Sequence, residues 1–499
     1  MSSGLEKLKV RLADVNALNA AQAIMDWDQQ CLMPEGGADA RGEQVSRLSR
    51  MSHEIFVGEE TQRALEDAEK EVSGDADDDD SALVRVVRRQ IDIETKLPGE
   101  LIAERAKLSA VGHEVWVKAR KNNDFKAFQP ILEQTVDISQ RIAEFLGYED
   151  HPYDAVTDQF EQGASRKFWD GMFDSIRQPL TDLVAEIKAS PNQPDDSFLT
   201  GKWEEEAQRS FSLKLLNGIG FRMDRGRLDT APHPFCTNFA IGDVRLTTRF
   251  LDYLPSAVFG SLHEAGHGMY EQGSPDEWDR TPLAGGVSLG WHESQSRTWE
   301  NIVGRSKAFW RHYYGDLQAT FPSLASVDLD TFYRSVNKSE ASLIRVEADE
   351  VTYNLHIMVR YELEKGMLDG SIAVKDVPDA WNSRYESYLG ITPPNDANGC
   401  LQDVHWSGGL LGYFPTYSMG NILSYQLWEL LEADLGDTDA LMERGEFAPI
   451  LNWLTDKVYS QGCKYPPQEL LKRVTGGGLD AEPYLRRIRA KYSEIYGLS

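Results

Sequence analysis

Residues 261–272, with the sequence SLHEAGHGMYEQ, constrain this chain more than any other stretch, because they contain His263, Glu264 and His267 in the pattern H-E-x-x-H. If the stretch is helical, two histidines four positions apart project from one face, and their ring nitrogens can bind one zinc ion at about 2.0–2.1 Å. Glu264 then lies beside the ion and can take a proton from water that the ion has acidified. A chance occurrence of so short a pattern is the alternative.

The composition is typical of a soluble globular protein. The chain has 499 residues, of which 41% are hydrophobic and 26% charged, so it can bury a large core and is not disordered throughout. Its net charge is −28. Such an acidic chain lacks the clustered Lys and Arg that bind phosphates, which argues against a nucleic-acid or anionic-membrane partner.

The four cysteines, Cys31, Cys236, Cys400 and Cys463, are widely separated and form no C-x-x-C pair. The sequence therefore predicts neither a disulfide framework nor a cysteine-bound zinc ion, and it favours a reduced compartment. The first 16 residues have the spacing of an amphipathic helix and lack the apolar run of a signal peptide. Because no run of about 18 apolar residues occurs, we expect no membrane-spanning segment and a cytoplasmic protein.

Apolar residues recur at intervals of three and four along most of the chain, which is the helical period. The pattern covers residues 5–24, 83–95, 98–117, 125–145, 288–310, 330–336, 341–365, 377–388, 423–435 and 467–475. The acidic stretch 73–81 is predicted to be a solvated connection, because it lacks the glycine and terminal glutamate of a calcium-binding loop. Residues 237–250 are rich in Thr, Val, Ile and Phe around Gly242-Asp243, which predicts a hairpin immediately before the metal helix. No internal repeat or linker interrupts the chain, so we expect one mainly α domain over residues 1–499, with a small β-sheet next to the active-site helix.

A catalytic zinc ion needs a third protein ligand and one open position. Glu293 is the best candidate, because it lies 26 residues beyond His267 on a different predicted helix, as in gluzincins. Gly273 stands where a metzincin would have its third histidine, so that arrangement is excluded. Two alternatives remain: Glu293 is a carboxylate stabilised by a helix dipole, or His292 is the ligand instead.

The chain resembles the carboxypeptidase Taq family of metallocarboxypeptidases, peptidase family M32, over nearly its whole length. Five separated motifs carry the resemblance: D-x-R-x-T at residues 243–247, H-E-x-x-H at 263–267, H-E-S-Q at 292–295, I-R-x-x-A-D at 344–349 and G-x-x-Q-D-x-H-W at 399–406. One such match would be weak evidence, whereas five in the right order are specific.

The resemblance implies a single-domain helical zincin fold of the neurolysin and angiotensin-converting-enzyme kind, with a deep groove. It also implies removal of single residues from peptide C-termini with broad preference, one divalent metal ion (zinc, with cobalt as the alternative) and a homodimer. Carried over by position, His263, His267 and Glu293 are the metal ligands and Glu264 is the catalytic base. We expect a helical part at about residues 1–150 to cover the groove, and the metal-site part to span about residues 230–425.

An exopeptidase acting at C-termini must recognise a free carboxylate, which a planar guanidinium binds through paired hydrogen bonds. Arg345 is the first choice for this role and Arg245 the second. For each arginine the alternative is a structural salt bridge, to Asp349 and Asp243 respectively, which lie close by in sequence.

The tetrahedral intermediate needs a hydrogen-bond donor for its oxyanion. His405, Tyr413 and Tyr417 are the candidates, with Tyr417 slightly favoured by analogy with related helical zincins, and a buried structural role is the alternative for each. Several gluzincins place an aspartate four positions after the ligand glutamate to orient a ligand histidine, but here that position is Arg297. The supporting carboxylate must therefore be another residue, and the candidates are Asp349, Asp403 and Glu300.

The sequence thus predicts a metallocarboxypeptidase in which Glu264 activates water and then protonates the departing amine. An endopeptidase or a dipeptidyl carboxypeptidase on the same fold is the nearest alternative. An aminopeptidase is disfavoured, because the G-x-M-E-N pattern is absent. A non-catalytic peptide-binding protein with a structural metal is disfavoured by the glutamate base, which a structural site does not need.

Overall fold

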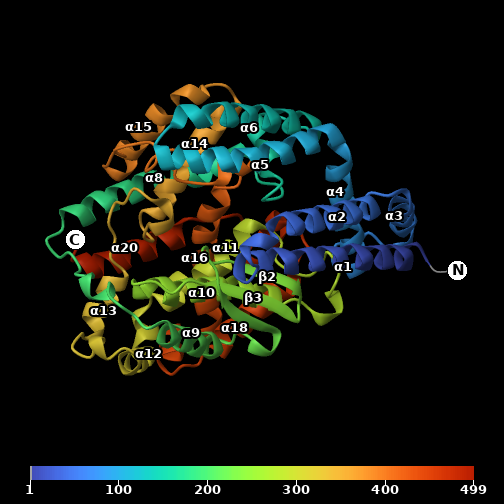
Figure 1. Cartoon of the computed structure of the whole chain (residues 1–499). Helices are drawn as coiled ribbons and strands as arrows, with labels where there is room; N and C mark the ends of the chain where they lie inside the picture. Colours follow the sequence, from blue (N-terminus) through green and yellow to red (C-terminus); the bar gives the residue numbers. More distant parts are fainter. Residues whose placement is uncertain (1–2, 499) are drawn as a thin grey trace.

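The structure, a computed structural model that describes residues 3–498, is mainly helical with one small sheet (Figure 1). The helices of the first half are α1 (Gly4–Cys31), α2 (Ala38–Phe56), α3 (Glu59–Glu71), α4 (Asp79–Lys96), α5 (Gly99–Asn122), α6 (Phe125–Leu146), α7 (Pro152–Thr157), α8 (Arg166–Ala189) and α9 (Glu205–Ile219). Those that follow are α10 (Leu254–Gln272), α11 (Leu289–Arg297), α12 (Lys307–Thr320), α13 (Leu329–Val336), α14 (Tyr353–Leu368), α15 (Val377–Leu389), α16 (Pro415–Leu435), α17 (Thr438–Glu443), α18 (Ala448–Lys457), α19 (Pro467–Thr475) and α20 (Glu482–Tyr496). The expected fold class is confirmed. No helix among the described residues is long and apolar enough to cross a membrane.

The sheet has three strands, β1 (Gly226–Thr230), β2 (Cys236–Ala240) and β3 (Asp243–Thr248), in the order β1-β3-β2. β2 and β3 form the predicted antiparallel hairpin, whereas β1, which was not predicted, pairs parallel to β3. Both β2 and β3 pack on α10, so the sheet lies beside the metal helix as expected (Figure 1).

Helix α10 runs through the main core and, among the helices, packs most extensively against α11. Nearly all of its residues are buried, because the sheet, α9 and α11 pack around it. Gly266 permits the close approach: a Cβ atom there would lie 2.4 Å from the carbonyl oxygen of Gln295. Since real Cβ atoms do not come so near, a side chain at Gly266 would push α11 away from α10. The glycine within the H-E-x-x-H pattern therefore helps to bring the H-E-S-Q motif to the histidines.

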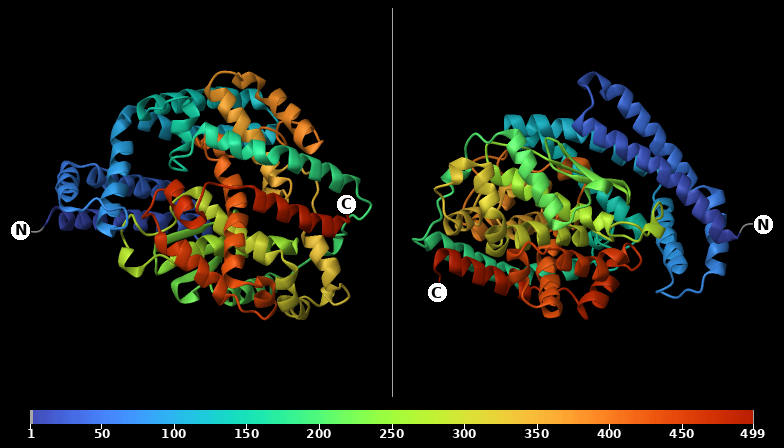
Figure 2. Two further views of the ribbon diagram at one scale, coloured as in Figure 1. Left: turned by 180° about the vertical axis from the view of Figure 1, so that it is seen from behind. Right: turned by 90° about the horizontal axis from the view of Figure 1, so that it is seen from below.

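The N-terminal helices α1, α3 and α4 have a hydrophobic cluster of their own and project from one side of the molecule (Figures 1 and 2). Trp278 and Leu283, from the segment that follows α10, complete this cluster. Residues of α1, α2, α4 and α5, together with Arg280–Pro282, line a cavity of about 1240 Å³. That the N-terminal part covers a substrate groove stays a prediction.

Three predicted helices differ most from the expected bounds. The pattern at 341–365 becomes helical only at Tyr353, because the side chain of Asp349 accepts hydrogen bonds from the backbone N–H and hydroxyl of Thr352 and holds a turn there. The pattern at 288–310 divides into α11, a π-helical segment over Thr298–Gly304, and α12. Helix α16 begins at Pro415 rather than at residue 423, so that it includes Tyr417.

Candidate metal centre

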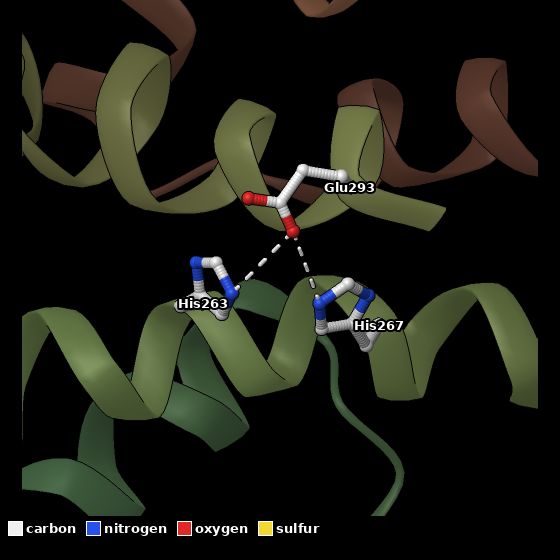
Figure 3. A group of neighbouring side chains, drawn as sticks. All are labelled: His263, His267 and Glu293. Carbon is white, nitrogen blue, oxygen red and sulfur yellow. Dashed lines mark ion pairs between the residues drawn. The ribbon is translucent and has the colours of Figure 1, made fainter. Parts of the chain in front are cut away.

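His263 and His267 lie one turn apart on α10, and Glu293 on α11 faces them (Figure 3). Oε2 of Glu293 lies 3.8 Å from Nε2 of His263 and 3.6 Å from Nε2 of His267. The donor atoms of the three residues all lie within 4.8 Å of one another. The sequence-predicted ligand set is therefore brought together from two helices.

This donor set fits a divalent transition metal. Ligands about 2.0–2.1 Å from a tetrahedral zinc ion are separated by about 3.3–3.4 Å, slightly less than the distances found here. Two imidazoles and one carboxylate are the ligands of a catalytic zinc site, which keeps a fourth position for water or substrate. The side chains of His263 and His267 are 21% and 19% exposed, so the site is open to solvent on the histidine side.

Glu264 lies on the same helix, α10, but is more buried than the two histidines. It is 6% exposed, and burial raises the pKa of its carboxyl to about 7. The nearby carboxylates of Glu293 and Glu300 add to this rise, whereas His263 opposes it. As the sequence predicts, Glu264 lies beside the ligands and is not part of the group of three donors.

The side chain of Glu300 supports His263 directly. Its Oε2 lies 2.9 Å from Nδ1 of His263, and it also accepts a hydrogen bond from Arg297 (3.2 Å). Arg297 in turn donates through Nε to Oε1 of Glu293 (2.6 Å). Glu300 is thus the one of the three predicted supporting acids that contacts a predicted ligand histidine, His263. Arg297, which stands where several gluzincins have an aspartate, holds the carboxylate of Glu293 in place.

The other two acids have different partners. Asp349 accepts hydrogen bonds at the turn before α14, and Asp403 pairs with two arginines. His292, the rival ligand in the sequence, does not belong to the donor group. Its Nε2 lies 2.7 Å from Oε1 of Glu271, and its Nδ1 lies 3.3 Å from Nδ1 of His267.

Arg345 lies in a buried cluster near the candidate metal ligands. Its Nε donates to Oδ1 of Asp403 (2.9 Å), its Nη2 lies 2.8 Å from the same oxygen, and its Nη1 donates to the hydroxyl of Tyr353 (2.8 Å). These contacts engage three of the five N–H groups of the guanidinium. The guanidinium carbon of Arg297 lies 4.6 Å from the centre of the Tyr353 ring, so one aromatic ring separates Arg345 from the arginine that holds Glu293. The salt bridge considered for Arg345 exists, but to Asp403 rather than to Asp349.

Arg360 was missed by the sequence reasoning. It is fully buried on α14, donates to Oδ2 of Asp403 (2.6 Å), and also donates to the side-chain oxygen of Gln402 (2.7 Å). The backbone N–H of Arg345 donates to the same Gln402 oxygen (2.8 Å). Asp403 is therefore shared by two arginines, which hold its pKa well below the usual range although burial opposes them. The pairing joins residues far apart in sequence, and only the Q-D pair of the last motif marks it.

Arg245 lies on β3 in a different setting. It makes a bidentate pair with Asp243 (2.9 and 3.0 Å), and its guanidinium stacks 4.4 Å from the ring centre of Trp27 and 4.7 Å from that of Phe239. Its contacts thus match the structural alternative, tying α1 to the sheet. A role in substrate binding remains an untested prediction for both arginines.

The three oxyanion candidates lie together. Nε2 of His405 is 3.4 Å from the hydroxyl of Tyr417, and the ring centres of Tyr413 and Tyr417 are 5.4 Å apart. The guanidinium of Arg345 lies 5.2 Å from the centre of the Tyr417 ring, which joins this group to the arginine cluster. Burial lowers the pKa of His405 to about 4; Asp403 opposes this effect, and Arg345 and Arg360 add to it. The imidazole is therefore neutral at neutral pH.

Comparisons with known proteins agree with this geometry. Residues 7–492 match the family model described as Carboxypeptidase Taq (M32) metallopeptidase. The chain is 40% identical to Carboxypeptidase 1 of Bacillus subtilis over 97% of both chains, and 39% identical to Thermostable carboxypeptidase 1 of Thermus thermophilus over 95% of both. The crystal structure of the M32 carboxypeptidase from Deinococcus radiodurans superposes with a TM-score of 0.96 at 37% identity, over 99% of both chains. With its motifs, fold and donor geometry all in agreement, the chain belongs to the carboxypeptidase Taq (M32) family of metallopeptidases.

Proposed function

We propose that this protein is a metal-dependent carboxypeptidase that releases single amino acids from peptide C-termini, with broad preference for the residue removed. Its family and its relatives show that it is a metallocarboxypeptidase, an enzyme that hydrolyses peptides. Release of single C-terminal residues is supported by one observation: three potential metal-binding donors converge beside Glu264, and Arg345, a buried arginine with unengaged N–H groups, is separated by the Tyr353 ring from Arg297, which donates to Glu293.

In the proposed reaction His263, His267 and Glu293 hold one divalent cation, which supplies Lewis acidity for the scissile carbonyl and for water. Glu264 takes a proton from the attacking water while the water oxygen bonds to the carbonyl carbon. When the C–N bond breaks, Glu264 passes that proton to the departing nitrogen. The products are a shortened peptide and a free amino acid, and Glu264 returns to its starting state.

Recognition of the terminal carboxylate is assigned to Arg345. Its two remaining N–H groups can form the paired hydrogen bonds that a carboxylate prefers, while Asp403 and Tyr353 fix its orientation. Such a receptor next to the metal ligands selects for a free C-terminus. The oxyanion donor is assigned to Tyr417, with Tyr413 and His405 as the alternatives, because Tyr417 adjoins both Arg345 and His405.

The other properties follow the family resemblance. We propose zinc as the ion, with cobalt as the alternative, because imidazole and carboxylate ligands in a four-coordinate site suit zinc. A homodimer and a cytoplasmic location are likewise proposed, without nucleic-acid or membrane partners, in agreement with the net charge of −28.

Mass spectrometry of a mixed peptide pool incubated with the zinc-loaded protein tests the proposal. The expected result is a ladder of products shortened one residue at a time from the C-terminus. Peptides with an amidated C-terminus should be cut far more slowly, because an amide cannot replace the carboxylate at Arg345. Internal cleavage that is insensitive to amidation would favour an endopeptidase, and release of dipeptides a dipeptidyl carboxypeptidase. A protein that binds metal and peptides without cleaving them would be the non-catalytic alternative.

A further inference from the structure

The imidazole of His292 lies between a ligand histidine and a buried carboxylate. Its Nδ1 is 3.3 Å from Nδ1 of His267, and its Nε2 is 2.7 Å from Oε1 of Glu271, which is 8% exposed. His292 adjoins Glu293 in sequence, yet its ring points to these two partners and not into the group of three donors. The proposed reaction assigns His292 no role.

The positions of the protons on His267 and His292 follow from one requirement. Nε2 of His267 faces Glu293 and must keep its lone pair for the cation, so in the neutral ring the proton lies on Nδ1. Only one proton fits between two facing Nδ1 atoms, and His292 must therefore accept it. The proton of His292 then lies on Nε2 and is donated to Glu271. The hydrogen bonds therefore run in one direction: His267 donates to His292, and His292 donates to Glu271.

Glu271 is itself fixed by groups outside the metal site. Its Oε2 accepts a hydrogen bond from Nδ2 of Asn238 on β2 (2.6 Å), and its Oε1 accepts one from the backbone N–H of Gly286 (3.3 Å). Gly286 also leaves space for the imidazole, since a Cβ atom there would lie 2.4 Å from the His292 ring. The sheet and the segment before α11 thus both hold the far end of the chain of hydrogen bonds.

We propose that His292 is a positioning residue for the metal site: with Glu271 behind it, His292 fixes the tautomer and the ring orientation of His267. Groups that orient a ligand histidine in this way affect metal affinity about 10- to 100-fold. The inference rests on the proposed metal site and deepens it. His263 has a carboxylate as its direct partner, whereas His267 reaches a carboxylate only through a second imidazole.

Two substitutions of His292 separate its two hydrogen bonds. Asparagine places a polar atom near the Nδ1 position and can still accept from His267, whereas glutamine places one near the Nε2 position and removes the side-chain acceptor that faces Nδ1 of His267. We expect His292→Gln to weaken zinc binding about 10- to 100-fold, and His292→Asn to weaken it less. Competition with a chromophoric chelator measures this on the full chain. His151→Gln is the matched control, because His151 makes a comparable pair with Asp369 (3.2 Å) away from the metal site and should leave the affinity unchanged.

A spectroscopic measurement on the unaltered protein covers the case in which a variant does not fold. In the zinc-loaded chain labelled with ¹⁵N-histidine, we expect a coupling between the two Nδ1 nuclei across the hydrogen bond, with the proton on His267. A proton on Nδ1 of His292, no coupling, or equal zinc affinity in both His292 variants and the wild type would overturn the inference. If the wild type binds zinc and hydrolyses peptides, but the expected coupling or the expected loss of zinc affinity is not found, only the role of His292 is refuted. If the wild type binds no zinc, the proposed function fails with it.

Discussion

The two sides of the site are built in different ways. The metal side consists of His263, Glu264, His267 and Glu293, on two helices that touch at Gly266. The side proposed to bind the substrate, called the recognition side, consists of Arg345, Gln402, Asp403, His405 and Tyr417. Most of these residues lie in turns and 3₁₀ segments, and an acid shared between two arginines holds them. Helix geometry fixes the first set locally, whereas a buried ion cluster fixes the second. Substitutions on the metal side should therefore abolish catalysis, and substitutions on the recognition side should lower stability and substrate affinity.

The largest effect is expected on the metal side. Glu264→Gln keeps the shape of the side chain and removes its ability to take a proton, so kcat should fall by about 10²- to 10⁴-fold. Metal content should stay at the wild-type level, because Glu264 is not one of the three donors. Peptidase assays and metal analysis on the same preparation test this. Near-normal turnover in a metal-loaded variant would refute Glu264 as the base.

Among substitutions on the recognition side, Asp403→Asn should lower the free energy of unfolding most. This change leaves Arg345 and Arg360 buried without the charge that they share, and removing one partner of a buried ion pair costs about 3–5 kcal/mol. Urea unfolding measures the free energy. Glu43→Gln is the matched control, since its pair with Arg47 is 67% exposed on both sides and should matter by less than about 1 kcal/mol. Equal effects of the two changes would show that the arginine cluster is not a structural support.

These two sides also differ in how far the sequence predicts them. The convergence of His263, His267 and Glu293 could be predicted because a spacing of four places two side chains on one helical face, and because a later glutamate is the usual third ligand in gluzincins. The pair of Arg345 with Asp403 spans 58 residues, and no periodicity reports such a contact. The parallel pairing of β1 with β3 was missed for the same reason.

Local capping explains another part of what was missed. The apolar pattern at 341–365 reads as one helix, but Asp349 holds a turn before Tyr353 and so places Arg345 in a 3₁₀ segment. Side chains such as Asp compete for backbone N–H groups, and tertiary contacts decide which outcome wins. His292 was considered as a ligand because it adjoins Glu293. Its contact with Glu271 depends on how α10 and α11 pack, which sequence spacing does not specify.

A comparison of Arg345 with Arg245, which lies on β3 outside the recognition side, tests which arginine binds the substrate carboxylate. Arg345→Lys replaces a planar donor by a point charge, and the loss of one charge-assisted hydrogen bond should lower kcat/KM about 10- to 100-fold, mainly through KM. Arg245→Lys should affect substrate binding less, because Arg245 is engaged by Asp243 and stacked against Trp27. Kinetics with free and amidated peptides test both variants. The reverse order of effects would make Arg245 the carboxylate receptor.

The smallest effect concerns the pH dependence of stability on the recognition side. His405 faces Asp403, Arg345, Arg360 and Tyr417, and its pKa falls from 6.5 to about 4 on folding. A group whose folded pKa is lowered contributes stability above its unfolded pKa, so this contribution is complete above pH 6.5 and is lost as the pH falls to 4.

Because His405 is only partly buried, solvent reduces the expected change to about 1–2 kcal/mol. His405→Asn cannot titrate, so its free energy of unfolding should fall less than that of the wild type between pH 7 and pH 4. Urea unfolding of both proteins at each pH isolates this difference, since the other acids titrate in both. Parallel curves would mean that folding does not lower the pKa of His405, so that its imidazole becomes a cation beside Arg345 as the pH falls below about 6.5. That result would contradict the description of the recognition side as one acid shared between two arginines and a neutral histidine.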